Sequence, residues 1–110
     1  MVFFGFWLSH VPPSAFEAFW ELVRECLAPG GRVAFVDEDD RAGTVVDDTR
    51  VVGGVPAARR TLRDGTQFDI VKVFWHPADL EDHLRGLDWN VKVRRVGQTF
   101  ICGVGHDARA

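Results

Sequence analysis

The feature that most constrains the fold is the order of the first three segments: an apolar run, a helix and a second apolar run. Residues Val2–Leu8 carry no charge and are almost entirely apolar, and Arg32–Asp37 contains the second run. Such runs are typical of strands in a parallel sheet that is covered on both faces. Two strands joined by a helix predict a β-α-β unit with a right-handed crossover. We therefore expect an α/β fold. Since a central strand needs neighbours and none precedes Val2, we expect the chain to be the second half of a larger domain.

The segment between the two runs has the signals of a helix. Ser14 and Glu17 have the S-x-x-E spacing of a capping box, in which each side chain accepts from the other residue's backbone amide. Apolar residues then recur at helical spacing as far as Leu27. Pro29 follows, and Gly30-Gly31 allows the chain to reverse into the next strand. The pattern predicts a helix over residues 14–28.

The remainder of the chain predicts a loop, a hairpin, a second helix and two closing strands. Asp37–Pro56 lacks periodicity and is interpreted as a long loop, with a short extended piece at Thr44–Val46. Asp64-Gly65 is a strong two-residue hairpin signal between two segments that are expected to be strands. Pro77 is suited to the first position of a helix, where its missing N–H is harmless. The predicted hairpin strands are Arg59–Arg63 and Phe68–Trp75, the helix is Pro77–Leu87, and the closing strands are Trp89–Val96 and Thr99–Val104.

Composition limits the function classes. The 110 residues are 46% hydrophobic with a net charge of −3, which allows one modest core and argues against broad nucleic-acid binding. No run approaches the roughly 20 apolar residues that cross a bilayer, and no basic segment precedes Val2, so we expect neither a membrane span nor a secretory signal. Cys26 and Cys102 lie in apolar contexts, which favours buried, reduced thiols and a cytoplasmic protein.

Three segments, taken in order, resemble the C-terminal half of a class I S-adenosylmethionine (SAM)-dependent methyltransferase. They are Phe6–Pro12, Leu27–Val33 and Phe35–Glu38. The resemblance covers Val2 to Gly105. It implies a partial Rossmann-like sheet in strand order 4-5-7-6, whose last strand is antiparallel, with helices mainly on one face and an extra β-hairpin. It also implies a methyltransferase-like domain over residues 1–105 and a loose tail over 106–110.

The chain departs from that family in the part that holds the cofactor. The family carries SAM on a glycine-rich loop before a helix and on an acidic residue that binds the ribose. Here Val52–Val55 contains two glycines but leads into Pro56 and no helix. SAM is thus the cofactor implied by the resemblance, and we expect the isolated chain not to bind it. A smaller departure is Asp88, where the family usually has glycine; Asp tolerates a left-handed helix end better than most residues.

Candidate site residues gather where the first two strands are expected to end. Open α/β sheets bind ligands at the carboxyl ends of their strands. By the resemblance, Trp7, Ser9 and His10 line the acceptor pocket, Asp37 and Glu38 lie at its rim, and Phe6 and Trp7 contact the cofactor if a partner completes the site. His10 could act as a general base near neutral pH. The alternative is that Ser9 and His10 only satisfy backbone groups before Pro12.

Two charged clusters have a functional and a structural interpretation. The run Asp37–Asp40 supplies oxygens that could hold Mg²⁺ or Ca²⁺, but its spacing matches no calcium loop and favours a solvated charged segment, so no metal site is expected. A basic group around the hairpin could meet an acidic substrate, although it more commonly forms the wet face of a two-stranded ribbon. Its members are Arg59, Arg60, Arg63 and Lys72.

The sequence leaves two functions open. One is a methyltransferase family protein with a small-molecule acceptor, truncated and inactive alone. The other is a non-catalytic module derived from that fold, which self-associates or binds a partner. Three origins fit these functions: a natural half that joins another chain, a remnant that self-associates, and a fragment of a longer product. For the chain alone we expect a homodimer or a complementing chain to cover Val2–Leu8 and the exposed sheet face, because a bare apolar edge strand invites pairing. The alternative is that the hairpin over Arg59–Trp75 folds back and covers that face within one chain.

Overall fold

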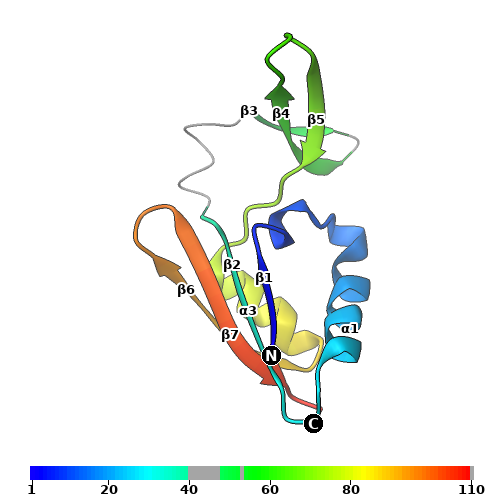
Figure 1. The fold of residues 1–110 in the computed structure, drawn as a ribbon, viewed down its shortest axis with the longest axis vertical. Helices are drawn as coiled ribbons and strands as arrows, with labels where there is room; N and C mark the ends of the chain where they lie inside the picture. The colour runs from blue at the N-terminus through cyan, green and yellow to red at the C-terminus, as the bar shows by residue number, and fades with distance from the viewer. Residues whose placement is uncertain (40–47, 53, 110) are drawn as a thin grey trace.

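The body of the protein is a four-stranded sheet with two helices, shown in Figure 1. The computed structural model describes residues 1–39, 48–52 and 54–109. The sheet order is β1-β2-β7-β6. β1 pairs parallel with β2, whereas β7 is antiparallel to both of its neighbours. The strands are β1 (Val2–Gly5), β2 (Arg32–Glu38), β6 (Trp89–Val96) and β7 (Phe100–Asp107). The expected α/β architecture is present, and the relative strand order agrees with the expected one.

The first strand is shorter than the apolar run predicted. β1 ends at Gly5 because Phe6 adopts a left-handed backbone, with φ of 57°. This left-handed backbone is not extended, so the strand cannot continue through Phe6. A bulky residue rarely takes this conformation. The short 3₁₀ helix η1 (Leu8–His10) follows. Trp7 and Leu8 therefore lie beyond the strand, and the prediction of a strand over Val2–Leu8 was wrong at its carboxyl end.

The first helix also begins later than predicted. A 3₁₀ turn, η2 (Pro13–Ala15), precedes α1 (Phe16–Cys26). Ala15 is the cap residue of α1 and provides no side-chain hydrogen bond, so the capping box predicted for Ser14 and Glu17 is not formed. Proline at the start of η2 fixes a tight turn before the α-helical hydrogen bonds begin.

The second helix, α3 (Pro77–Gly86), begins at its proline as predicted. The Nδ1 atom of His76 accepts a hydrogen bond from the Ala78 amide at 3.3 Å. Across both helices and the rest of the described chain, no helix is long and apolar enough to cross a bilayer.

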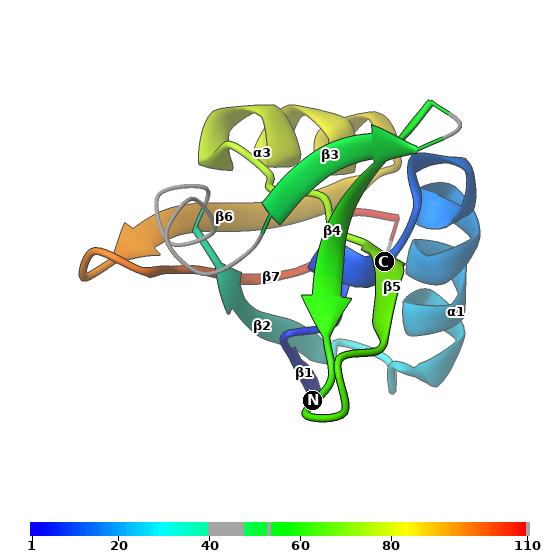
Figure 2. The same ribbon diagram turned by 90° about the horizontal axis from the view of Figure 1, so that it is seen from above.

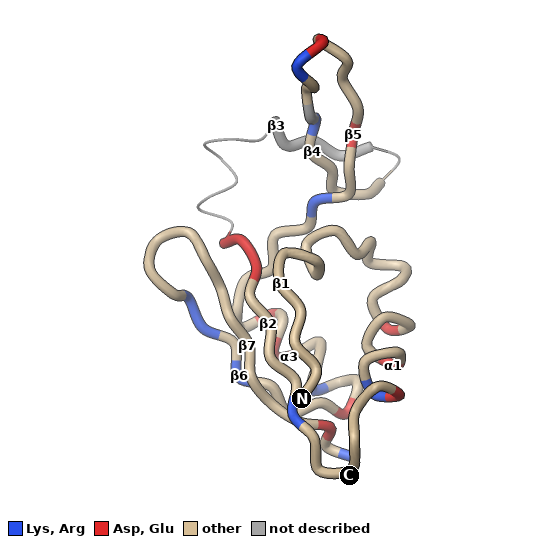
Figure 3. The backbone as a smooth tube through the Cα atoms, in the orientation of Figure 1, with Lys and Arg blue, Asp and Glu red and all other residues tan. Residues whose placement is uncertain are grey.

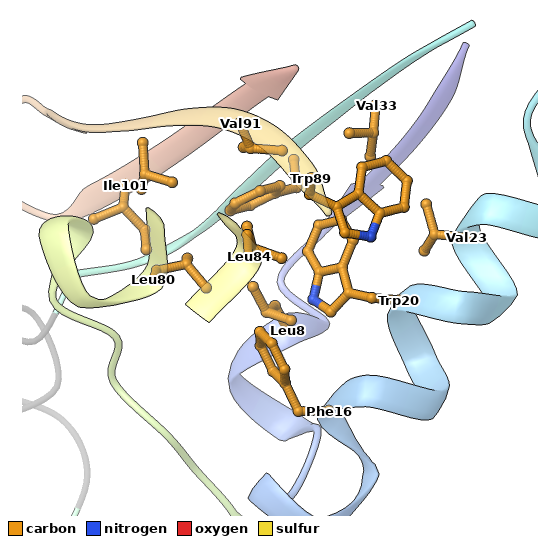
Figure 4. Packing of buried hydrophobic residues seen from close by; sticks show 12 residues of the cluster. Leu8, Phe16, Trp20, Val23, Val33, Leu80, Leu84, Trp89, Val91 and Ile101 are labelled. Carbon is orange, nitrogen blue, oxygen red and sulfur yellow. The ribbon is translucent and has the colours of Figure 1, made fainter. Parts of the chain in front are cut away.

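Both helices pack on the same face of the sheet, as seen end-on in Figure 2. Figure 4 shows the resulting core, in which Trp20 of α1 and Trp89 of β6 lie together. Their ring centroids are 5.2 Å apart in an edge-to-face arrangement. Leu80 and Leu84 contribute from α3, and both are fully buried. The layer between the helices and the sheet holds seven aromatic residues: Phe4, Phe16, Phe19, Trp20, Phe35, Trp75 and Trp89.

A second, three-stranded antiparallel sheet stands beyond the carboxyl ends of β1 and β2 (Figure 1). It consists of β3 (Asp48–Val52), β4 (Val55–Thr61) and β5 (Gln67–Val71). The predicted hairpin around Asp64 is present, although its connection spans five residues rather than two. Part of the predicted long loop over 37–56 is strand, which corrects that interpretation. The extended piece predicted at Thr44–Val46 lies outside the described residues.

The end of the chain is more ordered than predicted. β7 continues to Asp107, so the expected loose tail does not begin at residue 106. Burial raises the pKa of Asp107, but the hydrogen bond from the Arg109 amide and the ion pair with Arg24 outweigh it and hold that pKa below its ordinary value.

Asp88 takes a left-handed backbone with φ of 63°, the conformation anticipated at this position.

The two cysteines differ from the prediction in their exposure. Both are free, as expected, but Cys26 at the end of α1 is exposed and Cys102 is only half-buried. Cys26 is the last residue of α1.

Candidate functional site

A buried carboxylate near the end of β2 holds the 3₁₀ turn η1 that follows β1. Asp37 is 2% exposed, and its Oδ2 atom accepts a hydrogen bond from the Ser9 amide at 2.8 Å. Its Oδ1 atom accepts from the Glu38 amide at 2.7 Å. Hydrogen bonds to a charged acceptor are among the stronger ones in proteins. Asp37 therefore fixes the position of η1 against the last residues of β2.

The last residue of β5 and the segment that follows it hold η1 in place through two contacts. The Val73 amide donates to the Ser9 carbonyl at 2.7 Å. The His10 Nδ1 atom lies 2.7 Å from the Val71 carbonyl oxygen. Because a carbonyl oxygen only accepts, Nδ1 must carry the proton, and in the neutral ring Nε2 then has a free lone pair. The contact with the last residue of β5 thereby selects the tautomer of His10 that carries its proton on Nδ1.

An ion pair joins the residue that follows β5 to the end of β2. The Nζ atom of Lys72, whose residue is 3% exposed, lies 2.9 Å from Glu38 Oε2. It also lies 5.4 Å from the centroid of the Phe74 ring. Lys72 is thus not part of a wet basic face, which corrects that interpretation of the hairpin. Arg59 lies near the surface, where its Nε atom is 3.5 Å from Asp69 Oδ1.

Two carboxylates of the acidic run at the end of β2, Asp37 and Asp39, are buried rather than solvated. Figure 3 shows this acidic segment at the end of β2, below the second sheet. Asp39 is fully buried, and its Oδ2 atom accepts from Arg95 Nε at 2.9 Å. Asp40 lies outside the described residues. Within the described ranges, no group of three or more His, Cys, Asp or Glu side chains is arranged to hold a metal ion.

The two aromatic residues that follow β1 remain accessible. Phe6 is 48% exposed and Trp7 is 53% exposed. The Phe6 ring contacts Phe100 edge-to-face, with a centroid distance of 5.8 Å. Ser9, in contrast, is buried, and its hydroxyl has no hydrogen-bond partner among the described residues. The accessible groups at this end of the sheet are therefore the two aromatic rings, half-buried His10 and Glu38.

The structure brings most of the expected residues together. Ser9, Asp37 and Glu38 are joined directly by hydrogen bonds, and His10 is the last residue of the same 3₁₀ turn as Ser9. A groove of about 560 Å³ lies elsewhere, between α1 and α3, and none of the expected residues lines it. The expected site residues therefore lie at the carboxyl ends of β1 and β2 and not in this groove.

Sequence reasoning missed the contribution of the segment after β5. The signal was present: Lys72 is the one charged residue in the run Ile70–Trp75. A lysine inside such a run is expected to be paired when the run is buried. Which carboxylate it meets could not be read from the sequence, because Glu38 lies 34 positions earlier.

Comparisons with known proteins found two solved structures, and no family model or curated protein matches the chain. One structure is a complex of DhpI with SAH: the TM-score is 0.78 at 44% identity, over 99% of this chain and 47% of that chain. The other is a complex of DhpI with SAM and HEP: the TM-score is 0.80 at 45% identity, over 96% of this chain and 49% of that chain. This chain therefore spans about half the length of the protein it matches. The matches support the resemblance to SAM-dependent methyltransferases and the α/β fold.

Proposed function

We propose that this chain is the acceptor-binding half of a SAM-dependent methyltransferase that acts on a small molecule. The supporting observation is the 44–45% identity to DhpI over nearly the whole chain, in complexes that contain SAM or SAH. The carboxyl ends of β1 and β2, where ligands bind in open α/β sheets, carry the accessible residues. Bound SAM supplies a methyl group on a positively charged sulfur.

The residues of this chain fit one side of that cofactor only. The exposed rings of Phe6 and Trp7 offer faces that attract a cation and stack on a planar group. The described ranges 1–39, 48–52 and 54–109 contain no glycine-rich turn that leads into a helix, which is the usual cradle for the rest of such a ligand. We therefore expect the isolated chain not to bind SAM appreciably.

In this proposal His10 is the general base. Its Nδ1 proton is committed to the Val71 carbonyl, so Nε2 is left to take the proton of the acceptor hydroxyl or amine. When Nε2 takes that proton, the acceptor oxygen or nitrogen keeps the electron pair with which it would bond to the methyl group that bound SAM would supply. Glu38 and Trp7 border the acceptor. Buried Ser9 and Asp37 act as positioning residues that hold His10 in place.

The test uses the chain completed by the part of DhpI outside the match, with SAM and HEP as substrates. His10→Asn is expected to lower the rate by at least ~100-fold, in the range typical of a lost general base. SAM affinity should stay within about threefold, because the change leaves the cofactor contacts intact. His83→Asn, at an exposed histidine of α3, is the matched control. An unchanged rate for His10→Asn would refute the assignment.

The competing function is a partner-binding module without catalysis. One observation favours it: the described part of the chain lacks a cofactor cradle while exposing an apolar sheet face. The two functions differ in the same assay. A completed domain that binds SAM and produces SAH is a methyltransferase, and one that associates without either property is a binding module.

A further inference from the structure

One face of the main sheet is apolar and bare. Strand alternation places Phe3, Ala34, Val36, Phe100, Cys102 and Val104 on the side opposite the helices, and these six residues are called the open face below. Phe3, Ala34 and Val104 form one continuous row across three strands. Phe3 is 65% exposed and Val104 is 44% exposed.

The size of the open face marks it as an interaction surface. Its exposed side chains, with the neighbouring Phe6 ring, leave on the order of 400 Å² of apolar surface wet, the size of patches that mark binding sites. In Figure 2 both helices lie on the other side of the sheet. Nothing else among the described residues covers this side.

β1 is also a free edge. It pairs with β2 and with no other described strand. The Phe6 amide bonds to Val36, so by alternation the amide and carbonyl groups of Phe3 and Gly5 face away from β2. The strand contains no charge and no proline, the usual devices that protect an edge from pairing. An added strand could bond there and extend past Gly5, next to Phe6 and Trp7.

We propose that the open face and the free edge of β1 bind a polypeptide equivalent to the part of DhpI that lies outside the match. This inference rests on the proposed function. That part is about half of DhpI, and this chain matches the other half almost completely. The partner is expected to supply one strand to β1 and apolar helices to the open face. Its strand would then end beside the exposed aromatic residues and form the second wall of the site.

Charge favours this partner over a second copy of the chain. Arg32, Lys92 and Arg94 fall on the same side as the open face and are exposed. Glu38, the one carboxylate on that side of these strands, is committed to Lys72. Two copies packed face to face would bring cations against cations, whereas a partner with acidic residues at its rim would neutralise them.

The experiment co-expresses the full chain with the part of DhpI outside the match. Light scattering during size-exclusion chromatography reports the complex, and calorimetry reports its SAM binding. We expect a one-to-one complex that binds SAM at least ~10-fold more tightly than either part alone. Phe3→Asp should weaken assembly by at least ~10-fold, as for a central apolar contact. Leu22→Asp, at a residue that is 55% exposed on α1, is the matched control.

Each outcome decides a separate point. A complex that assembles but does not bind SAM supports the docking surface and contradicts the proposed function. Absence of a complex overturns the docking proposal, and so does equal weakening by both variants. Sedimentation of the chain alone provides an independent measurement, since a discrete homodimer that Phe3→Asp dissociates would show that a second copy is the occupant.

Discussion

Replacing Asp37 with Asn should weaken the hydrogen bonds that hold η1, the turn that carries His10. The carboxylate accepts from two backbone amides, Ser9 at 2.8 Å and Glu38 at 2.7 Å, and is 2% exposed. An asparagine keeps one acceptor oxygen but turns an N–H₂ group toward an amide donor. One charge-assisted hydrogen bond, worth about 1.5–3 kcal/mol, is lost, and two buried donors are left facing each other. A neutral side chain is cheaper to bury, which offsets part of this loss.

We expect Asp37→Asn to lower the free energy of unfolding by about 2 kcal/mol, a sizeable part of the roughly 5–15 kcal/mol that stabilises a domain. Urea unfolding followed by tryptophan fluorescence measures the change. Hydrogen exchange should show faster opening of the Ser9 amide than of the β2 amides. Asp82→Asn is the control, because that carboxylate is 68% exposed and pairs with an exposed arginine. A loss below about 0.5 kcal/mol, the level expected of an exposed pair, would refute the reasoning.

Three further predictions concern the fold. Gly103→Ala should destabilise by about 1–3 kcal/mol, because a Cβ there would lie 2.3 Å from the Phe35 ring; thermal unfolding should show partial recovery when Phe35→Leu is added. Asp88→Val should cost about 1–2 kcal/mol at its left-handed position, whereas Asp88→Gly should remain within about 0.5 kcal/mol of the parent; urea titration of both compares them. Because the pKa of Asp107 is lowered in the fold, its contribution is present above about pH 4 and is lost as pH falls through the folded pKa. Asp107→Asn should therefore show a shallower loss of stability on acidification, and an identical pH profile would contradict this.

The sequence by itself determined the order of elements and the layer that holds them together. Apolar runs, helical spacing and proline or glycine positions are local signals, and they placed α1, α3, β2, β6 and β7 within a few residues of their observed bounds. The left-handed conformation of Asp88 was also a local feature, since it depends on backbone conformation within two or three residues.

Only the tertiary structure decided how the site is built. The left-handed backbone of Phe6 ends β1 early, and no composition rule predicts such strain in a phenylalanine. The pairing of Lys72 with Glu38 joins the residue that follows β5 to the last residue of β2. Charged side chains look alike in a sequence whether they are solvated or buried, because burial depends on partners that distant segments bring. The same reason applies to the turn that carries His10. Ser9 bonds to Asp37 and Val73, and His10 contacts Val71, all from segments far apart in the chain. Such hydrogen bonds are set by packing and not by local preference.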